Sequence, residues 1–183
     1  MTTIVDNDLS HTIIGTINAD TIFAQGGNDL VRGGGGNDFI SGGSGGDVLF
    51  GEAGNDFMTG DAGQDFMFGG LGSDTMTGGA GANSFIYSAL AESLPGTAHD
   101  NISDFVHLTD KIDLHSIDAV QSLTGNQDFK FIGTGNFGFE GDVRVAFTNG
   151  NTLIQANTDT DSTPEFEIQL SGLHTISSTD FFL

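Results

Sequence analysis

Aspartates recur at nine-residue intervals through the first half of this chain, and carboxylates at a fixed spacing can bind a series of cations. Counted from residue 15, the sixth position of eight successive nonapeptides is occupied by Asp20, Asp29, Asp38, Asp47, Asp56, Asp65, Asp74 and Asn83. Carboxylates stacked at strand spacing repel one another strongly unless a cation lies between them. Hard oxygen ligands in a flexible loop favour Ca²⁺ over softer metals. The pattern therefore predicts rows of calcium sites, about five or six ions in all.

Glycine fills most of the first, second and fourth positions of the same units. Glycine allows tight turns that leave carbonyl oxygens exposed, so these positions are expected to contribute to the metal sites beside the carboxylates. The predicted glycine positions are Gly33, Gly34, Gly36, Gly42, Gly43, Gly45, Gly51, Gly54, Gly60, Gly63, Gly69, Gly70, Gly72, Gly78 and Gly81.

The eighth position of every unit is apolar, and it indicates which elements hold the ligands. It is occupied by Ile22, Val31, Ile40, Leu49, Met58, Met67, Met76 and Phe85. The last three residues of each unit can form a short strand whose middle side chain points inward. A period of nine is too short for helical repeats and is typical of a parallel β-roll. Two units make one coil, so carboxylates eighteen residues apart are expected to stack on one edge, Asp20 with Asp38, Asp56 and Asp74, and Asp29 with Asp47, Asp65 and Asn83 on the other.

These units resemble the G-G-x-G-x-D-x-U-x repeat of RTX calcium-binding proteins. Residues 33–41, 42–50, 51–59 and 69–77 match it closely, whereas the first unit, 15–23, is degenerate and Asn83 replaces the last Asp. The resemblance implies a Ca²⁺-binding β-roll. A flexible linker made of Gly-Asn-Asp turns would not keep an apolar residue in phase over eight units.

The composition changes near residue 84, from glycine-rich units to aromatic and β-branched segments. Strands are expected at 84–87, 101–105, 111–114, 129–132, 142–148, 152–156 and 166–170, with a hairpin turn at Asn149-Gly150. Helix is limited to a short turn or two at 88–94. The predicted fold is all-β, a parallel β-roll continued into a C-terminal antiparallel β layer or sandwich. The predicted division is an N-terminal cap segment at 1–14, the roll at 15–86 and a C-terminal β domain at 87–183.

The second half resembles the C-terminal part of serralysin-type secreted metalloproteases, without their protease domain. The resemblance rests on Asn101-Ile102-Ser103-Asp104-Phe105, Asp110-Lys111-Ile112-Asp113-Leu114, Phe131-Ile132-Gly133 and the closing Asp180-Phe181-Phe182-Leu183. Similar modules end secreted lipases and alginate epimerases, so the resemblance indicates a module and not an activity. It implies an extracellular location reached through a type I secretion exporter, with residues 180–183 as the signal. The start of the chain also lacks the cationic and apolar pattern of a signal peptide. The last residues can also form a terminal edge strand packed on the sheet, and both interpretations can hold because an exporter meets the unfolded chain.

Charge restricts the possible partners. The net charge is −21 with only four Lys and Arg, which argues against direct binding of nucleic acid or an anionic membrane. No stretch approaches the length of a membrane span, so no membrane insertion is expected. Without metal, charge of one sign should keep the repeats expanded.

No catalytic residue is predicted, although two motifs match by accident of the glycine content. Residues 42–46 fit G-x-S-x-G but lie inside a repeat turn, and residues 133–138 fit the dinucleotide fingerprint without a following helix. The five histidines, which lack zinc-protease spacing, are interpreted as surface or turn residues: His11, His99, His107, His115 and His174.

Two features leave alternatives open. Residues 157–165 place oxygen side chains at alternate positions, which fits either a further Ca²⁺ site or a plain acidic hairpin loop. The seventh and ninth positions of each unit are expected to point outward, and alternate units belong to opposite sheets. One of the two sheets is more apolar on its outer face, where it has Leu30, Val48, Phe50, Phe66 and Phe68. Such a stripe is rarely left in water, so a covering segment or a homo-oligomer is expected.

The sequence as a whole predicts a secreted, non-catalytic Ca²⁺-binding protein that folds when it meets extracellular calcium. The alternatives are a carbohydrate-binding or adhesion module of the alginate-epimerase type, which would bind an extracellular polysaccharide, and the C-terminal domain of a secreted protease or lipase.

Overall fold

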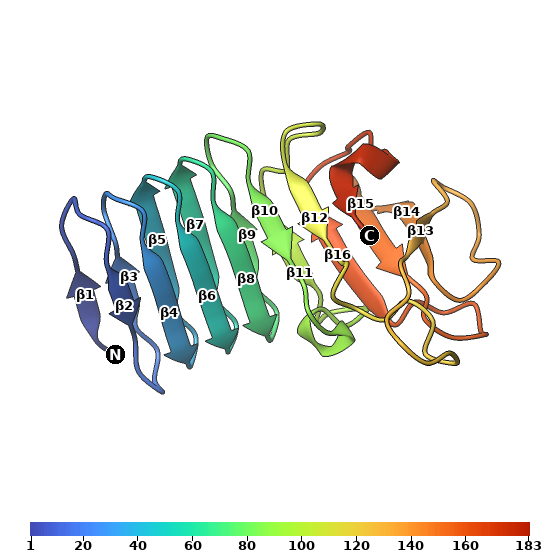
Figure 1. Cartoon of the computed structure of the whole chain (residues 1–183), viewed down its shortest axis with the longest axis horizontal. Coiled ribbons are helices and arrows are strands. Elements are labelled where there is room, and N and C mark those ends of the chain that lie inside the picture. Colours follow the sequence, from blue (N-terminus) through green and yellow to red (C-terminus); the bar gives the residue numbers. More distant parts are fainter.

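The computed structural model describes all residues, 1–183, as two facing β-sheets joined by short turns (Figure 1). Successive strands of the first half alternate between the sheets, so each coil of chain contributes one strand to each. The coils are stacked along the long axis, with the N-terminus at one end and the antiparallel strands at the other. This arrangement confirms the predicted parallel β-roll.

The ten-stranded sheet has, in spatial order, β1 (Thr3–Val5), β3 (Thr21–Phe23), β5 (Phe39–Ser44), β7 (Phe57–Ala62), β9 (Thr75–Thr77), β11 (Asp100–Ile102), β16 (Phe166–Leu170), β15 (Asn151–Ala156), β14 (Asp142–Thr148) and β13 (Lys130–Phe131). The seven-stranded sheet has β17 (Phe181–Phe182), β12 (Lys111–Asp113), β10 (Ser84–Ile86), β8 (Phe66–Leu71), β6 (Val48–Ala53), β4 (Leu30–Gly35) and β2 (Thr12–Ile14). Two 3₁₀ turns complete the structure, η1 (Leu90–Glu92) and η2 (Ser178–Asp180). No helix has the length and apolar character needed to cross a membrane.

The roll is in register at an interval of eighteen residues. Phe39 is paired with Phe57, and Val48 with Phe66, in parallel ladders. Because side chains alternate along a strand, the eighth position of each unit points between the sheets. All eight of these apolar side chains are fully buried, as the sequence predicts. They form one continuous core with the aromatic residues of the C-terminal region.

The strands β4 to β8 are twice as long as predicted, because each continues through the first three positions of the next unit. The glycine-rich segments therefore form hydrogen bonds between coils and are more than linking turns. The fourth position has φ between +94° and +148° in the seven units where it is glycine. A side chain is strained there, which explains why glycine recurs at this position. The second position also has positive φ but accepts Gln25, Glu52 and Asp61.

The sheets of the roll continue into the second half without interruption. Strand β11 pairs with β9 and β12 with β10, both parallel. Strands β16, β15 and β14 then form the predicted antiparallel layer, with Asn149 and Gly150 in the hairpin turn. The predicted strands are all present to within a few residues, and η1 lies in the predicted helical segment. The division into three segments remains a prediction.

The two accidental motifs lie where the sequence places them. Residues 42–46 belong to β5 and the turn after it, and residues 133–138 form a loop between β13 and β14 with no helix. Neither has the surroundings of a nucleophile elbow or a dinucleotide site.

The outer face of the seven-stranded sheet is partly accessible. Phe66 is 39% exposed, whereas Phe50 and Phe68 are half-buried and stack with ring centroids 4.4 Å apart. Ser84, an outward position of the next unit on the same sheet, would also be expected outside but is buried. Whether a second copy covers this face remains a prediction.

Candidate calcium-binding turns

The repeated aspartates form two hydrogen-bonded ladders, one along each edge of the roll. In each ladder the backbone N–H of one residue donates to the side-chain Oδ1 of the residue eighteen positions later, at 2.7–3.1 Å. One ladder contains Asp20, Asp38, Asp56 and Asp74, and the other contains Asp29, Asp47, Asp65 and Asn83. The structure thus brings the predicted residues together on the predicted edges, although their role as metal ligands remains a prediction.

The second carboxylate oxygen lacks a partner in most of these turns. The Oδ2 atoms of Asp29, Asp38, Asp47, Asp56, Asp65 and Asp74 are buried and accept no hydrogen bond. A buried carboxylate oxygen without a donor is costly, and a bound cation is one way to satisfy it.

The first-position glycines line the space around these oxygens. A Cβ added to Gly33 or to Gly42 would lie 2.5 Å from the Oδ2 of the aspartate five residues later. The same Cβ atoms would lie 2.9–3.0 Å from the backbone oxygens of Gly51 and Gly60, respectively. From residue 33 to residue 68, each such turn therefore gathers a carboxylate and a backbone carbonyl around a space that glycine keeps open. This all-oxygen donor set fits Ca²⁺.

Burial of the stacked carboxylates changes their acidity. Desolvation, together with the negative charge of neighbouring aspartates, raises the pKa of Asp56 to about 7 and that of Asp65 to about 6. Burial also raises the pKa of Asp74 to about 6. Without a cation, the centre of the roll therefore holds its protons several pH units above the ordinary range of aspartate. A divalent ion placed between the turns would favour the charged forms.

The N-terminal end of the first ladder is satisfied without an ion. Asp20 accepts from the backbone N–H of Thr2 and from both the N–H and the hydroxyl of Thr16, at 2.6–2.7 Å. The Thr16 hydroxyl, despite opposing desolvation, lowers the pKa of Asp20. Asp20 therefore differs from the interior aspartates in having no free oxygen.

Two aspartates outside the nonapeptide phase continue the ladders, and a third binds the glycines of a neighbouring turn. Asp100 accepts the N–H of Asp74 at 2.8 Å, and Asp110 accepts that of Asn83 at 2.9 Å. Asp104 accepts the N–H groups of Gly78 and Gly79, both at 2.8 Å. The sequence interpretation did not include these residues among the sites. Asp100 and Asp110 each begin an Asp-x-Ile-x segment that resembles the second half of a repeat, which is the signal that could have revealed them.

The acidic loop between β15 and β16 folds around its own side chains. Asn157 Oδ1, Asp159 Oδ1 and Asp161 Oδ1 each accept a backbone N–H two residues later. Oxygens of Asp159, Asp161 and Glu165 lie within 4.8 Å of one another. These self-contained turns are compatible with both predicted alternatives, so the choice between them stays open.

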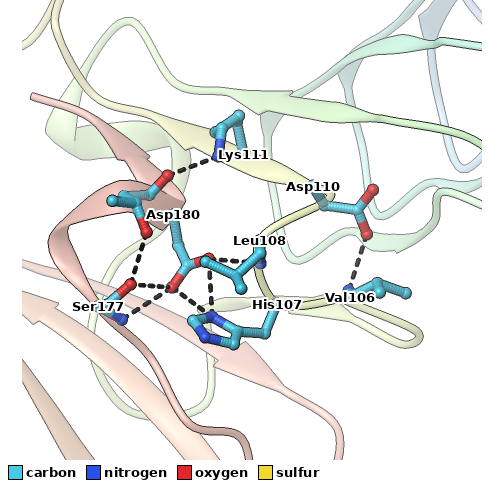
Figure 2. Close-up of polar contacts among 8 residues, drawn as sticks. Val106, His107, Leu108, Asp110, Lys111, Ser177 and Asp180 are labelled. Atoms are coloured by element: carbon cyan, nitrogen blue, oxygen red, sulfur yellow. Dashed lines mark hydrogen bonds and ion pairs between the residues drawn. The ribbon is translucent and has the colours of Figure 1, made fainter.

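The last residues of the chain are held in place by a buried carboxylate (Figure 2). Asp180 accepts from the N–H of Leu108 at 2.9 Å, from that of Ser177 at 2.7 Å and from the His107 ring at 2.8 Å. The Lys111 ammonium donates to the carbonyl of Thr179 on the same segment. Strand β17 then pairs with β12. The structure thus shows the predicted edge strand, while a role of these residues in export remains a prediction.

Comparison with protein families agrees with this geometry. The model of the RTX calcium-binding nonapeptide repeat (4 copies) matches residues 14–49, 41–76 and 50–85. Residues 14–85, less than half of the chain, thus match the RTX calcium-binding nonapeptide repeat. Repeats of this family generally bind calcium, and the match covers both aspartate ladders. A search of curated proteins finds no match.

Three solved structures align with this chain over nearly its whole length. The AlgE6R2 subunit of the mannuronan C5-epimerase of Azotobacter vinelandii has a TM-score of 0.51 and 22% identity, with 97% of this chain and 90% of that one covered. The AlgE6R3 subunit of the same epimerase has a TM-score of 0.44 and 26% identity, with 96% and 78% covered. The extracellular lipase LipA of Serratia marcescens has a TM-score of 0.35 and 14% identity, with 99% and 39% covered. At this identity, the likeness to AlgE6R2 supports the fold alone.

Proposed function

We propose that this RTX chain is a non-catalytic calcium-binding module that folds on meeting extracellular Ca²⁺ after type I secretion. The observation that supports it most is the row of buried Oδ2 atoms without donors, one in each interior turn. An ion at each of these places would hold the carboxylates of successive coils together. The ligands would be the interior aspartates with carbonyl oxygens of the glycine-rich turns.

The energetics suit a switch between low and millimolar calcium. Extracellular modules bind Ca²⁺ with Kd of roughly 10⁻⁴ to 10⁻³ M. At about 1 mM free Ca²⁺, each such site contributes roughly 0.4–1.4 kcal/mol to folding. Six sites would contribute about 2–8 kcal/mol, which is comparable with the whole stability of an ordinary domain. About six ions would also offset roughly half of the net charge of −21.

Secretion follows from the same argument. A chain whose acidic repeats stay expanded at low calcium remains threadable through an exporter, and it folds on the far side. Because Asp180 and Phe181 are buried and β17 is paired with β12 in the folded state, an exporter that reads residues 180–183 would have to read them before folding. Co-expression with a type I exporter should deliver the chain to the medium, and removing residues 181–183 should retain it in the cell. Export unchanged by that truncation would place the signal elsewhere.

The calcium-dependent step is tested by circular dichroism. Titration of the chelated protein with Ca²⁺ should produce β-structure cooperatively, while Mg²⁺ at the same concentration should do little because it requires tighter octahedral geometry. A spectrum that is already fully β in excess chelator would contradict the proposal.

A polysaccharide-binding role is the alternative. A hollow beside the β15–β16 loop is lined by Phe137 and Phe139 together with Glu140, Asp159 and Asp161. Aromatic faces suit sugars, but this acidic lining does not suit a polyanion directly. Binding of a neutral glycan that is lost in Phe139→Ala would favour this alternative.

A further inference from the structure

The first coil of the roll has a histidine where every other coil has an aspartate or asparagine. Strand β2 pairs with β4 at the same interval of eighteen residues, so His11 lies level with Asp29. The backbone N–H of His11 donates to Asp29 Oδ1 at 2.7 Å, as the aspartates of the ladder do. Residues 6–11 are therefore one more turn of the second edge, although they contain none of the repeated glycines.

Three side chains converge in this turn. His11 Nδ1 lies 2.9 Å from Asp6 Oδ2. Ligand atoms of Asp6, His11 and Asp29 all lie within 4.8 Å of one another. Asp29 is 2% exposed, and its Oδ2 accepts no hydrogen bond. Asp6 Oδ2 is likewise buried and has no partner except the His11 ring. Two buried carboxylate oxygens thus lie close to one imidazole nitrogen, and that nitrogen cannot donate a hydrogen bond to both of them.

The donor set of this turn differs from that of the calcium turns. Ca²⁺ takes oxygen ligands, and an imidazole nitrogen in place of a carboxylate weakens such a site. Zn²⁺ instead accepts imidazole nitrogen and carboxylate oxygen together, and water can complete its tetrahedral shell. The His11 side chain is 40% exposed, which leaves room for an ion and its water to enter.

We propose that Asp6, His11 and Asp29 form a Zn²⁺ site at the N-terminal end of the roll, separate in metal preference from the calcium turns. The bound ion joins the first coil to the second by bridging residues eighteen and more positions apart. The roll would then use two metals: Ca²⁺ between the interior coils and a transition metal at the coil that ends the stack.

The chain offers a matched control for this site. His115 Nδ1 lies 2.5 Å from Asp113 Oδ1, so it forms the same kind of histidine–aspartate pair. The His115 side chain is more exposed than that of His11, and no third carboxylate or histidine ligand lies within reach of the pair. An ordinary ion pair should bind Zn²⁺ weakly, whereas the three-ligand turn should bind it with defined stoichiometry.

The test uses the full chain in saturating Ca²⁺, with β-structure first confirmed by circular dichroism. Zn²⁺ is then titrated by calorimetry in competition with a chromophoric chelator. We expect one Zn²⁺ per chain, an affinity lowered about 100-fold in His11→Gln, and no change in His115→Gln. The His11 imidazole resonances should shift on Zn²⁺ addition, while those of His115 should not.

A second variant keeps the inference testable if His11→Gln disturbs the first coil. His11→Asp restores the repeated aspartate, so it should lose the Zn²⁺ site and bind one further Ca²⁺. A folded protein that binds no Zn²⁺, or binds it equally in His11→Gln, would overturn the inference. Failure of the calcium proposal would appear earlier and separately, as β-structure that does not depend on Ca²⁺.

Discussion

The interior of the repeats at 14–85 and most of the region after them use buried aspartate in opposite ways. In the repeats, one carboxylate oxygen of each interior aspartate accepts a hydrogen bond from the backbone of the previous coil, and the other oxygen is buried without a donor. After the repeats, Asp104, Asp110 and Asp180 have both oxygens satisfied by protein N–H groups. The first arrangement lacks something that an ion can supply, whereas the second is complete. Asp100 belongs with the repeats in this respect, because its buried Oδ2 also has no donor. We therefore expect metal dependence to be concentrated in the repeats and in Asp100 next to them.

The hydrophobic core is also smaller per strand in the repeats than in the region after them. Each strand of the roll contributes one inward side chain, and its turns contribute only glycine and small residues. The later region buries large aromatic residues such as Tyr87 and Phe166, whose rings meet edge to face at 5.1 Å. Apolar burial is the main favourable term in folding, so the roll has less of it to offset its repelling carboxylates.

Removal of calcium should separate the two regions most strongly. In excess chelator, the backbone amides of β5 to β8 should lose their protection from hydrogen exchange, because repulsion within the ladders is no longer neutralised. The amides of β14 to β16 should keep more of theirs. Exchange followed by mass spectrometry, with and without Ca²⁺, measures this directly. Loss of protection at the same rate in both regions would show that the molecule unfolds as a single unit.

A methyl group added to a turn should have the next largest effect. Gly54 has φ of +143°, and a Cβ there would collide with the backbone oxygen of Gly36 in the adjacent coil. Gly54→Ala should therefore cost about 3 kcal/mol of unfolding free energy at saturating Ca²⁺. Gly150 has φ of +82° in the β14–β15 hairpin but has open space around it, so Gly150→Ala should cost only about 1 kcal/mol. Chemical denaturation compares them, and equal costs would contradict the close stacking of the coils.

Neutralising one aspartate in each region should give effects of different metal dependence. Asp56→Asn removes a charge from the middle of a ladder, so it should weaken and broaden the Ca²⁺ transition. In chelator, the same change should be neutral or stabilising, because a buried carboxylate with a raised pKa is lost. Asp104→Asn should cost about 1–2 kcal/mol whether or not Ca²⁺ is present.

Thermal unfolding of both variants with and without Ca²⁺ reads out this difference. Asp20→Ala provides a control within the ladder, because Asp20 has no free oxygen and should affect Ca²⁺ cooperativity less than Asp56→Ala. Equal effects of the two alanine variants would argue against shared ions in the interior turns.

The interior ladders of the roll and the buried Asp180 carboxylate should respond to acid with opposite signs. The pKa values of Asp56, Asp65 and Asp74 are raised from 3.8 to about 6–7 by burial, so the folded roll binds protons more tightly than the unfolded chain. Without Ca²⁺, this contribution to stability is full below about pH 4 and is lost as the pH rises through 6–7. The pKa of Asp180 is lowered instead, because hydrogen bonds from Leu108, Ser177 and His107 outweigh its burial, so its contribution is lost as the pH falls below its folded pKa.

Thermal melts in chelator between pH 8 and pH 4.5 measure the roll part of this response. The melting temperature should rise as the pH falls, and the Ca²⁺ affinity should fall over the same range because protons compete for the carboxylates. A metal-free protein that loses stability steadily from pH 8 to pH 4.5 would contradict the burial of these groups.

The smallest expected effect concerns the outer surface of the roll. Phe66 is 39% exposed on the seven-stranded sheet, whereas Phe166 of the later region is fully buried. Phe66→Ser with Phe68→Ser should cost about 1–2 kcal/mol, or should dissociate a dimer if a second copy covers this face. Melting temperature and mass in solution at saturating Ca²⁺ are the measurements. The matched pair Phe39→Ser with Phe57→Ser, on the other sheet, should leave the mass unchanged.

Much of the roll could be predicted from the sequence, because its structure repeats at the period of its residues. The inward column from Ile22 to Phe85, the two edges of aspartates and the glycine turns all follow from a nine-residue phase and the alternation of side chains along a strand. The all-β character of the later region and its Asn149-Gly150 hairpin also follow from local signals. The length of β4 to β8 could not be predicted from the sequence, because glycine-rich segments have little strand propensity and become strands only when they are stacked on another coil.

Only the tertiary structure decided which side chains meet across the coils. Asp100 and Asp110 extend the ladders from 26 and 27 residues away, because the chain makes a longer excursion before it returns to the same edge. His11 reaches Asp29 because the first coil is in register with the roll although its residues do not match the repeat. Sequence period determines contacts between equivalent positions of equal coils. Where coils differ in length or composition, the partners are set by the parallel register of the backbone, which no local pattern of residues specifies.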